Sequence, residues 1–221
     1  MQRFILRQNI LNFQKVLEAE TSEASRHTLR SLVATARRQL ALLEANAKGA
    51  ELGQPFRLLR DGAASKGVRY LKSFRQRFEM AAAPSMLLDP AAGLRIVDIN
   101  DAYAQVTMTK AADLRGNPLF DVFPDNPDDP LADGVSNLYA SLGAAVQTTR
   151  AHAMAIQRYD IRDLQGYFVQ RYWRPINTPI YDDAGNLIAL LHSVDDVTGE
   201  IQKAMSFDAK SRLDDSRRTE A

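Results

Sequence analysis

The sequence of 221 residues contains no cysteine, and it has only three histidines and one tryptophan. Without cysteine the chain forms no disulfide framework, thiolate metal site or iron–sulfur cluster, and it has no thiol nucleophile. Photochemistry through a cysteine–flavin adduct is excluded for the same reason. The longest apolar runs fall well short of the roughly 18–20 residues that span a bilayer. Disulfide-rich, thiol-dependent and membrane-spanning classes are therefore disfavoured from the start.

The residues that are present have the composition of a folded globular chain, with 45% hydrophobic and 25% charged residues. Arg7 and Asn9 interrupt the apolar stretch at the N-terminus, so it lacks the continuous core of a signal peptide. We therefore expect a cytoplasmic protein with no membrane partner.

The net charge of +1 hides an asymmetry between two parts of the chain. Residues 1–80 contain 15 Lys and Arg against 7 Asp and Glu, whereas residues 81–221 contain 13 against 20. Such an asymmetry raises the question of a nucleic-acid partner. The alternative is that the two parts attract each other, or a second copy of the chain, and both interpretations remain open.

Apolar residues recur at helical spacing in the first 50 residues and predict two helices, over about 2–20 and 23–46. The short turn between them makes an antiparallel helical hairpin, and Gly49 ends the second helix. The pair alone buries one seam, so we expect a second copy or the rest of the chain to complete its core. The two stripes that would form such an interface are Leu6, Ile10, Phe13 and Leu17 on the first helix, and Leu29, Leu32, Ala36, Leu40 and Leu43 on the second.

Beyond the hairpin the pattern changes twice. Glycine and proline mark residues 50–67 as a linker, and a third helix is predicted from Val68 to Ala82, where Pro84 stops it. Alternating patterns and turn residues then predict strands, with a longer amphipathic helix at 134–149 in their midst. The predicted strands cover 85–89, 95–100, 153–161, 168–180 and 187–194.

This order of elements, with the residues that fill it, resembles a PAS sensor domain of bacterial signalling proteins over about residues 75–201. Each matching segment is short, and the resemblance rests on their order and spacing together. The segments are 78–81, 84–89, 96–103, 114–124, 172–180, 183–186 and 195–198.

The resemblance implies an α+β fold with a five-stranded antiparallel sheet and short helices on one face, preceded here by the helical hairpin. The chain then divides into a hairpin arm for dimerisation or partner binding at 1–49, the linker at 50–67, the PAS domain with its entry helix at 68–201, and a short helix with a frayed tail at 202–221. One fold hosts many roles. Family members sense ligands or cofactors, bind partners or only dimerise.

Domains of this family commonly contain a hollow between sheet and helices. The residues that we expect to line it are Leu88, Tyr103, Phe120, Phe123 and Trp173. A completely filled core is the alternative, and we favour it.

The cofactor remains unknown, and the sequence requires none. A flavin used for redox chemistry alone has no supporting motif. Haem would need an axial histidine in the long helix, whereas His152 follows that helix. His27, His152 and His192 lie far apart in the sequence, so no metal site is predicted.

No acid–base pair or nucleophile stands out, so we predict a non-enzymatic signal-transduction module. It would be a sensor or adaptor that forms a homodimer and relays a signal to a partner protein through its helices. Asp196 and Thr198 are the predicted signal exit, because a carboxylate or hydroxyl there caps the next helix and bonds across the strand end.

Two other functions stay open. One is a transcriptional regulator that binds nucleic acid through the basic N-terminal helices, which the dispersed cations disfavour. The other is a PAS sensor with a bound small molecule or haem.

Overall fold

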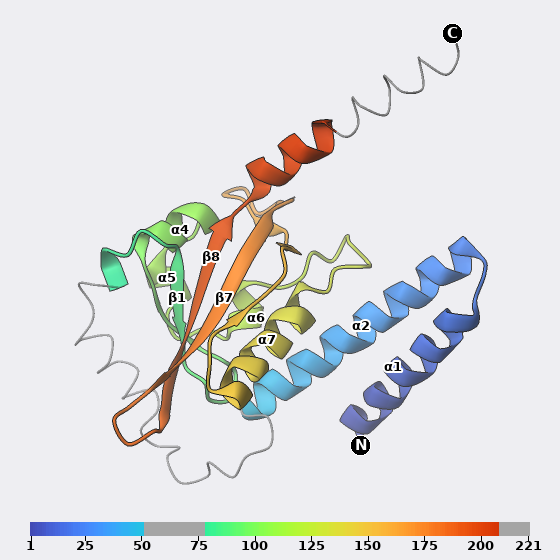
Figure 1. Ribbon diagram of the computed structural model, residues 1–221, viewed down its shortest axis with the longest axis horizontal. Helices are drawn as coiled ribbons and strands as arrows, with labels where there is room; N and C mark the ends of the chain where they lie inside the picture. Colours follow the sequence, from blue (N-terminus) through green and yellow to red (C-terminus); the bar gives the residue numbers. More distant parts are fainter. Residues whose placement is uncertain (51–77, 208–221) are drawn as a thin grey trace.

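In the computed structural model, which describes residues 1–50 and 78–207, a long helical hairpin extends from a sheet that carries helices on one face (Figure 1). The helices are α1 (Gln2–Ala19), α2 (Glu23–Lys48), α4 (Asp101–Thr107), α5 (Ala111–Leu114), α6 (Leu119–Val122) and α7 (Gly134–Thr148). The strands are β1 (Ser85–Leu88), β2 (Ile96–Ile99), β3 (His152–Ala153), β4 (Gln157–Arg158), β5 (Ile161–Arg162), β6 (Phe168–Val169), β7 (Tyr172–Tyr181) and β8 (Leu187–Asp196). A further helix begins at Thr198 and is described as far as residue 207. The predicted linker at 50–67 and the predicted helix from Val68 to Ala82 lie largely outside the described residues.

The hairpin of α1 and α2 forms as its apolar spacing predicts. Glu20 follows α1, and its carboxylate accepts hydrogen bonds from the amides of Thr21 and Ser22 at 2.8 Å each, which fixes the turn. Arg26 of α2 donates back to the carbonyl oxygens of Leu17 and Glu20 at 3.1 and 2.8 Å. These oxygens end a helix and have no partner within it, so Arg26 joins the two helices.

The C-terminal end of α2 is fixed against the turn between β1 and β2. Gly49 has a φ of +63°, and a Cβ atom there would lie 2.1 Å from the carbonyl oxygen of Pro90, so only glycine fits. The Ala50 amide donates to that oxygen at 3.0 Å. The Gly93 amide donates to the Ala45 oxygen in the last turn of α2 at 2.8 Å. The arm is therefore attached to the sheet at its base.

The main sheet is antiparallel in the order β2-β1-β8-β7-β3, and β4 also pairs with β7. The five predicted positions are confirmed, since β3 and β4 together occupy the fifth, but the continuous strand predicted over 153–161 is wrong. The strand predicted over 168–180 is also interrupted, because its first residues pair with β5 in a separate ribbon. Asp163 closes that ribbon locally, since its carboxylate accepts from the amides of Gln165 and Tyr167 at 2.9 Å each.

A bulge separates β3 from β4. Ala153 pairs with Ile176 and Gln157 pairs with Trp173, so three residues of the outer strand lie opposite two residues of β7. Pro175 lies in this stretch of β7 and has no amide hydrogen with which to continue the ladder. The interruption between β3 and β4 is therefore explained by Pro175 in the neighbouring strand β7, and the sequence of the outer strand alone does not reveal it.

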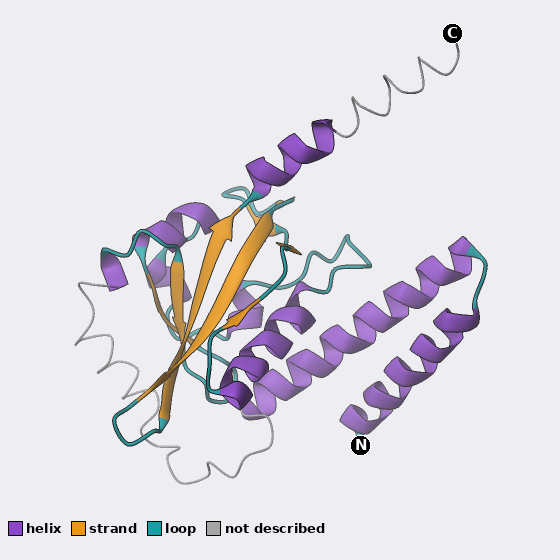
Figure 2. Ribbon diagram, viewed as in Figure 1, coloured by secondary structure: helices purple, strands orange, loops and turns teal. Residues whose placement is uncertain are grey.

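The side chains of β7 alternate between two faces. Trp173 and Asn177 point inward and are buried, whereas Ile176 between them is 41% exposed. The main core lies between this inner face and the helices from α4 to α7 (Figure 2). On the opposite face, Leu87 and Ala189 are also buried, and Phe78 packs against that smaller cluster. The C-terminal half of α2 packs against α7, and its buried residues Ala41 and Ala45 belong to the main core.

Candidate ligand cavity

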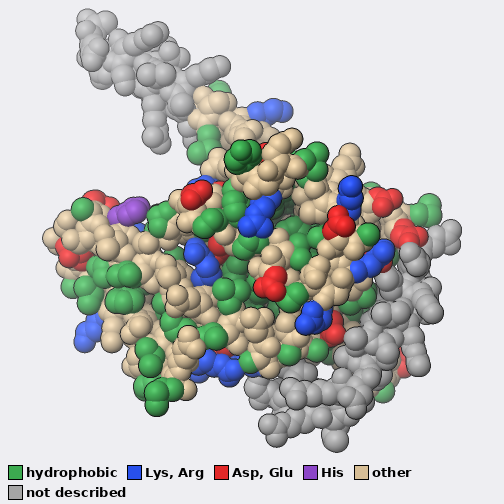
Figure 3. All heavy atoms as spheres, turned by 180° about the vertical axis from the view of Figure 1, so that it is seen from behind, with side chains coloured by type: hydrophobic (Ala, Val, Ile, Leu, Met, Phe, Trp, Pro, Cys, Tyr) green, Lys and Arg blue, Asp and Glu red, His purple; other side chains and the backbone are tan. Residues whose placement is uncertain are grey.

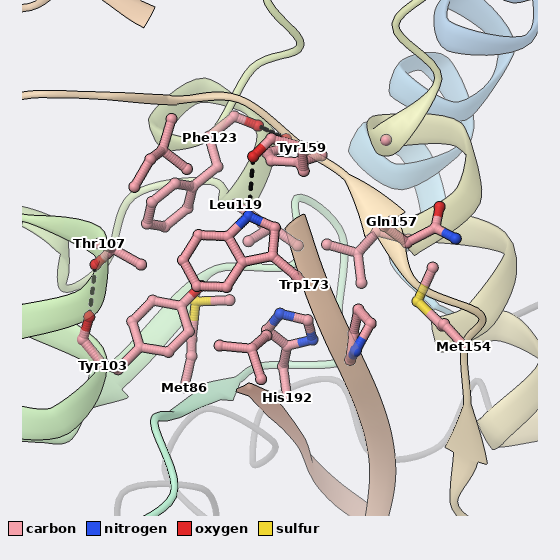
Figure 4. Close-up of a pocket in the computed structure, with 15 residues that line it drawn as sticks. Met86, Tyr103, Thr107, Leu119, Phe123, Met154, Gln157, Tyr159, Trp173 and His192 are labelled. Carbon is pink, nitrogen blue, oxygen red and sulfur yellow. Dashed lines mark hydrogen bonds between the residues drawn. The ribbon is translucent and has the colours of Figure 1, made fainter. Parts of the chain in front are cut away.

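A cavity lies between the inner face of the sheet and the helices α4, α6 and α7. The cavity volume is about 60 Å³, on a scale where one water molecule needs roughly 10–15 Å³. It therefore has room for several waters or one small molecule. Its walls are mostly apolar, and the residues that define it best are Met86, Tyr103, Phe123, Met154, Trp173 and His192 (Figure 4).

Three aromatic side chains form the centre of the lining. The rings of Tyr103 and Phe123 meet edge to face, with their centroids 6.1 Å apart. The Trp173 indole lies in the middle of the lining residues, and its Nε1 donates to the carbonyl oxygen of Tyr159 at 2.8 Å (Figure 4). That hydrogen bond holds the indole in one orientation.

Asn100 positions Tyr103. Its side-chain oxygen accepts from the Tyr103 amide at 2.9 Å and so caps α4. The same oxygen accepts from the amide of Ser85 in β1 at 2.9 Å. One buried amide therefore sets both the start of α4 and its place on the sheet.

One side of the cavity lies between α7 and the outer strand. Leu138 of α7, Met154 in the bulge and Gln157 of β4 are half-buried and line the cavity. The Gln157 side-chain oxygen accepts from Asn137 Nδ2 at 2.8 Å, which joins β4 to α7 on this side. The extra residue of the bulge lets both Met154 and Gln157 face inward.

A chain of hydrogen bonds runs from the cavity toward the surface. His192 Nδ1 lies 2.8 Å from Asn177 Oδ1, and Asn177 Nδ2 donates to Ser141 Oγ at 2.7 Å. Ser141 Oγ lies 2.8 Å from Nδ1 of the half-buried His152. Asn177 is fully buried, so these bonds satisfy an amide that would otherwise be costly to bury.

The polar groups that face the cavity are uncharged at neutral pH. Burial lowers the pKa of His192 to about 4, which keeps its imidazole neutral. Burial also raises the pKa of the Tyr103 hydroxyl, so that group stays protonated. Because the surrounding walls are apolar, a charged ligand group would be costly to place here.

Asp125 connects the arm to the cavity wall, which we define as Phe123 and Tyr159. One carboxylate oxygen accepts from Arg38 Nε of α2 at 2.6 Å, and the other accepts from the Val135 amide at the start of α7 at 2.9 Å. Burial raises the pKa of Asp125, and the Val135 amide and Arg38 partly offset that rise. The Tyr159 hydroxyl donates to the carbonyl oxygen of Phe123, two residues before Asp125.

The residues predicted to line a hollow divide into two groups. Tyr103, Phe123 and Trp173 line the cavity, whereas Leu88 and Phe120 lie in the packed core beside it. The favoured alternative of a completely filled core therefore needs correction, because the filled part borders a small open space.

His192 also lines the cavity, although it is not among the residues predicted to do so. Its position in the alternating pattern of β8 could have revealed it. His192 takes the same face of β8 as the buried residues Ile188, Leu190 and Val194, which places a polar ring inward. Met86 and Met154 were missed as well, and nothing in their local sequence separates them from ordinary core residues.

The predicted interface stripes lie partly inside the chain. Leu6 and Ala36 are buried, whereas Leu32 is 42% exposed. The other stripe residues are half-buried, namely Ile10, Phe13, Leu17, Leu29, Leu40 and Leu43. The large apolar side chains that α1 exposes lie elsewhere on that helix, at Phe4, Ile5, Leu11 and Val16.

The predicted signal exit has the geometry that the sequence suggested. Asp196 Oδ1 accepts from the Thr198 amide at 2.9 Å, so it caps the following helix. Thr198 Oγ1 accepts from the Tyr172 amide of β7 at 3.0 Å, across the end of the sheet. A role in signal output stays a prediction.

Within residues 1–50 and 78–207 no group of three or more His, Asp or Glu side chains is placed to hold a metal ion. None of the helices described there is long and apolar enough to cross a membrane.

Comparison with known proteins gives one family and a set of similar structures. A family model described as the PAS fold matches residues 83–202. The PAS domain of a protein from Colwellia psychrerythraea is 15% identical with a TM-score of 0.43, and the match covers 59% of this chain and 98% of that one. The PAS domain of BvgS from Bordetella pertussis is 17% identical with a TM-score of 0.44, and the match covers 65% of this chain and 98% of that one. The PAS domain of the fruit-fly ELK potassium channel is 15% identical with a TM-score of 0.41, and the match covers 58% of this chain and 98% of that one. A search of curated proteins finds no match.

Proposed function

Because this chain belongs to the PAS fold family and is therefore a sensory or signalling module, we propose that it relays the state of its cavity to a partner protein through its helices. It does so as a homodimer and without catalysing a reaction. The observation that carries the proposal is the Asp125 carboxylate, which binds the arm through Arg38 and the first turn of α7 through Val135.

The proposed relay begins at the cavity wall. Gly134, the first residue of α7, and the Tyr159 ring both line the cavity, and they lie in direct contact. A ligand that shifts Tyr159 therefore pushes on the start of α7, where the Val135 amide holds Asp125. Arg38 then passes the displacement to α2, because its guanidinium is bound to the same carboxylate.

The proposed output is the hairpin arm. It exposes Leu32 and several large apolar side chains of α1, which a partner or a second copy would cover. The arm extends away from the sheet, as does the helix that follows β8 (Figure 1). We assign the dimer contact to this arm.

A nucleic-acid-binding role receives less support. Of the eight Lys and Arg side chains in residues 1–50, five lie in ion pairs with Glu or Asp of the chain, at Arg7, Arg26, Arg30, Arg38 and Lys48. On the face seen in Figure 3, cationic and anionic side chains are interspersed rather than gathered into one basic patch. A backbone-phosphate footprint needs clustered, unpaired cations.

The relay is tested by perturbing the wall without a ligand. Gly134→Ala places a methyl group against Tyr159, and Gly199→Ala is the matched control because its Cβ has open space. Hydrogen exchange of the α2 amides around Arg38 should change in the first variant and stay as in the parent protein in the second. Tyr159→Phe, which removes the hydrogen bond to Phe123, provides a gentler perturbation with the same expected effect. Unchanged exchange in both folded wall variants would contradict the relay.

A further inference from the structure

Two polar atoms of the cavity lining, Nε2 of His192 and the hydroxyl oxygen of Tyr103, have no hydrogen-bond partner among the described residues. His192 and Tyr103 are 5% and 4% exposed, and both line the cavity. Among the described residues, His192 bonds only through Nδ1, and the Tyr103 hydroxyl bonds to nothing. Their rings meet edge to face with centroids 6.2 Å apart, so the two side chains are neighbours in the cavity lining. Buried polar groups in proteins are almost always paired, and unpaired ones that surround a space indicate an occupant.

The hydrogen-bond chain behind His192 determines what its free nitrogen offers. Asn177 Nδ2 donates to Ser141 Oγ and lies 3.6 Å from Met154 Sδ, and sulfur only accepts, so the amide nitrogen faces that side. Asn177 Oδ1 therefore faces His192 and accepts a hydrogen bond from its Nδ1–H. Nε2 of His192 then carries the lone pair and points its acceptor at the cavity.

The Tyr103 hydroxyl supplies the opposite function. A protonated phenol donates one hydrogen bond, and here that donor has no acceptor in the described protein. The cavity thus presents one acceptor and one donor between apolar walls. A single hydroxyl group complements both, because its hydrogen donates to His192 while its oxygen accepts from Tyr103.

We infer that the cavity takes a small uncharged alcohol, held by its hydroxyl between His192 Nε2 and the Tyr103 hydroxyl, with its hydrocarbon part against Met86 and Met154. This inference rests on the proposed sensory role of the cavity. Space for roughly four waters limits an unadjusted ligand to about five heavy atoms. The two methionines are flexible enough to admit somewhat larger molecules.

The test uses two probes of equal size, cyclobutanol and cyclobutanone. Both accept a hydrogen bond, but only the alcohol donates one. Binding is followed by the methyl resonances of ¹³C-labelled methionine, of which Met86 and Met154 line the cavity. The alcohol should bind about tenfold more tightly than the ketone, because the ketone leaves His192 unpaired. The ¹⁵N resonance of His192 Nε2 should move with the alcohol and stay fixed with the ketone.

The variant Tyr103→Phe separates the two contacts. It removes a hydroxyl that has no protein partner, so the fold should be kept. Affinity for both probes should fall severalfold, while the preference for the alcohol is retained. Tyr181→Phe, which lies at the far end of β7 and outside the cavity lining, is the matched control and should change neither affinity.

The outcomes distinguish this inference from the proposed function. Equal binding of the two probes in the cavity, with no movement of the His192 resonance, overturns the alcohol and leaves a ligand-binding sensor standing. If neither probe moves the Met86 and Met154 resonances at concentrations up to the solubility limit, the alcohol inference is overturned, whereas the relay from Tyr159 to Arg38 is decided separately by hydrogen exchange in Gly134→Ala.

Discussion

The Tyr159 ring lies against Gly134 so closely that a Cβ atom on the glycine would fall 1.8 Å from Cδ2 of the ring. Gly134→Ala must therefore displace the ring or the start of α7. Overpacking of this kind typically costs about 1–3 kcal/mol. Urea unfolding should show that loss, whereas Gly199→Ala, in a helix with open space around it, should match or exceed the parent stability. Equal stability of both variants would mean that the ring moves away freely.

The burial of His192 predicts a pH dependence of stability. Its pKa is about 4 in the folded protein against 6.5 in the unfolded chain, so between these values only the unfolded chain takes up the proton. The free energy of unfolding should fall as pH falls from about 6.5 to 4, by up to about 3 kcal/mol, and this contribution should level off below pH 4.

The control for that dependence is His192→Phe. The variant should be less stable overall because Asn177 loses its partner, yet its stability should lose the slope between pH 6.5 and 4. Asp125 has a raised pKa, so its own contribution runs in the opposite direction and should remain in both proteins. A slope that survives in His192→Phe assigns the effect to another group.

Removing Arg38 should leave a buried carboxylate without its cation. The Asp125 side chain is 2% exposed, so Arg38→Met should cost about 2–4 kcal/mol in unfolding free energy. The same change at Arg37, which is exposed on α2, should cost less than about 0.5 kcal/mol. The double variant Arg38→Met with Asp125→Asn should recover part of the loss. No recovery would show that Arg38 acts through packing of its stem.

The assignment of the dimer contact to the arm predicts the result of adding charge there. Glutamate at both Leu32 and Leu40 should reduce the mass measured by light scattering from that of a dimer to that of a monomer. Gln39→Glu adds a charge at an exposed position between the two and should leave the mass unchanged. A mass that the double variant does not alter means that these stripes form no dimer.

The regular elements followed from local patterns. The helices α1, α2 and α7 have apolar residues at a period that only a helix places on one side, and β1, β2 and β8 lie where alternation and turn residues predicted strands. Gly49 was identifiable because the positive φ that ends a helix favours a residue without a side chain. Of the five residues that the family resemblance led us to expect around a hollow, Tyr103, Phe123 and Trp173 line the cavity.

The features that the sequence did not predict depend on contacts between residues far apart along the chain. The bulge between β3 and β4 is explained by Pro175, which lies opposite only once the strands have paired. The direction in which His192 presents its lone pair depends on Asn177 and Ser141, which come from another strand and a helix. The attachment of Arg38 to Asp125 spans 87 positions, and neither residue has a distinctive neighbourhood.

Because Gly49 fixes only the C-terminal end of α2 to the sheet, a small rotation at that end moves the far end of the arm by a larger distance. The helix is 26 residues long, or roughly 39 Å at 1.5 Å per residue. Its base is fixed to the β1–β2 turn, and the hold from Arg38 lies well short of the tip. A tilt of about 5° at the base would therefore carry the distant end by about 3 Å. A displacement of about 1.3 Å at Arg38, roughly 15 Å from the base, would thus become about 3 Å at the hairpin tip, large enough to make or break a contact with a neighbouring molecule.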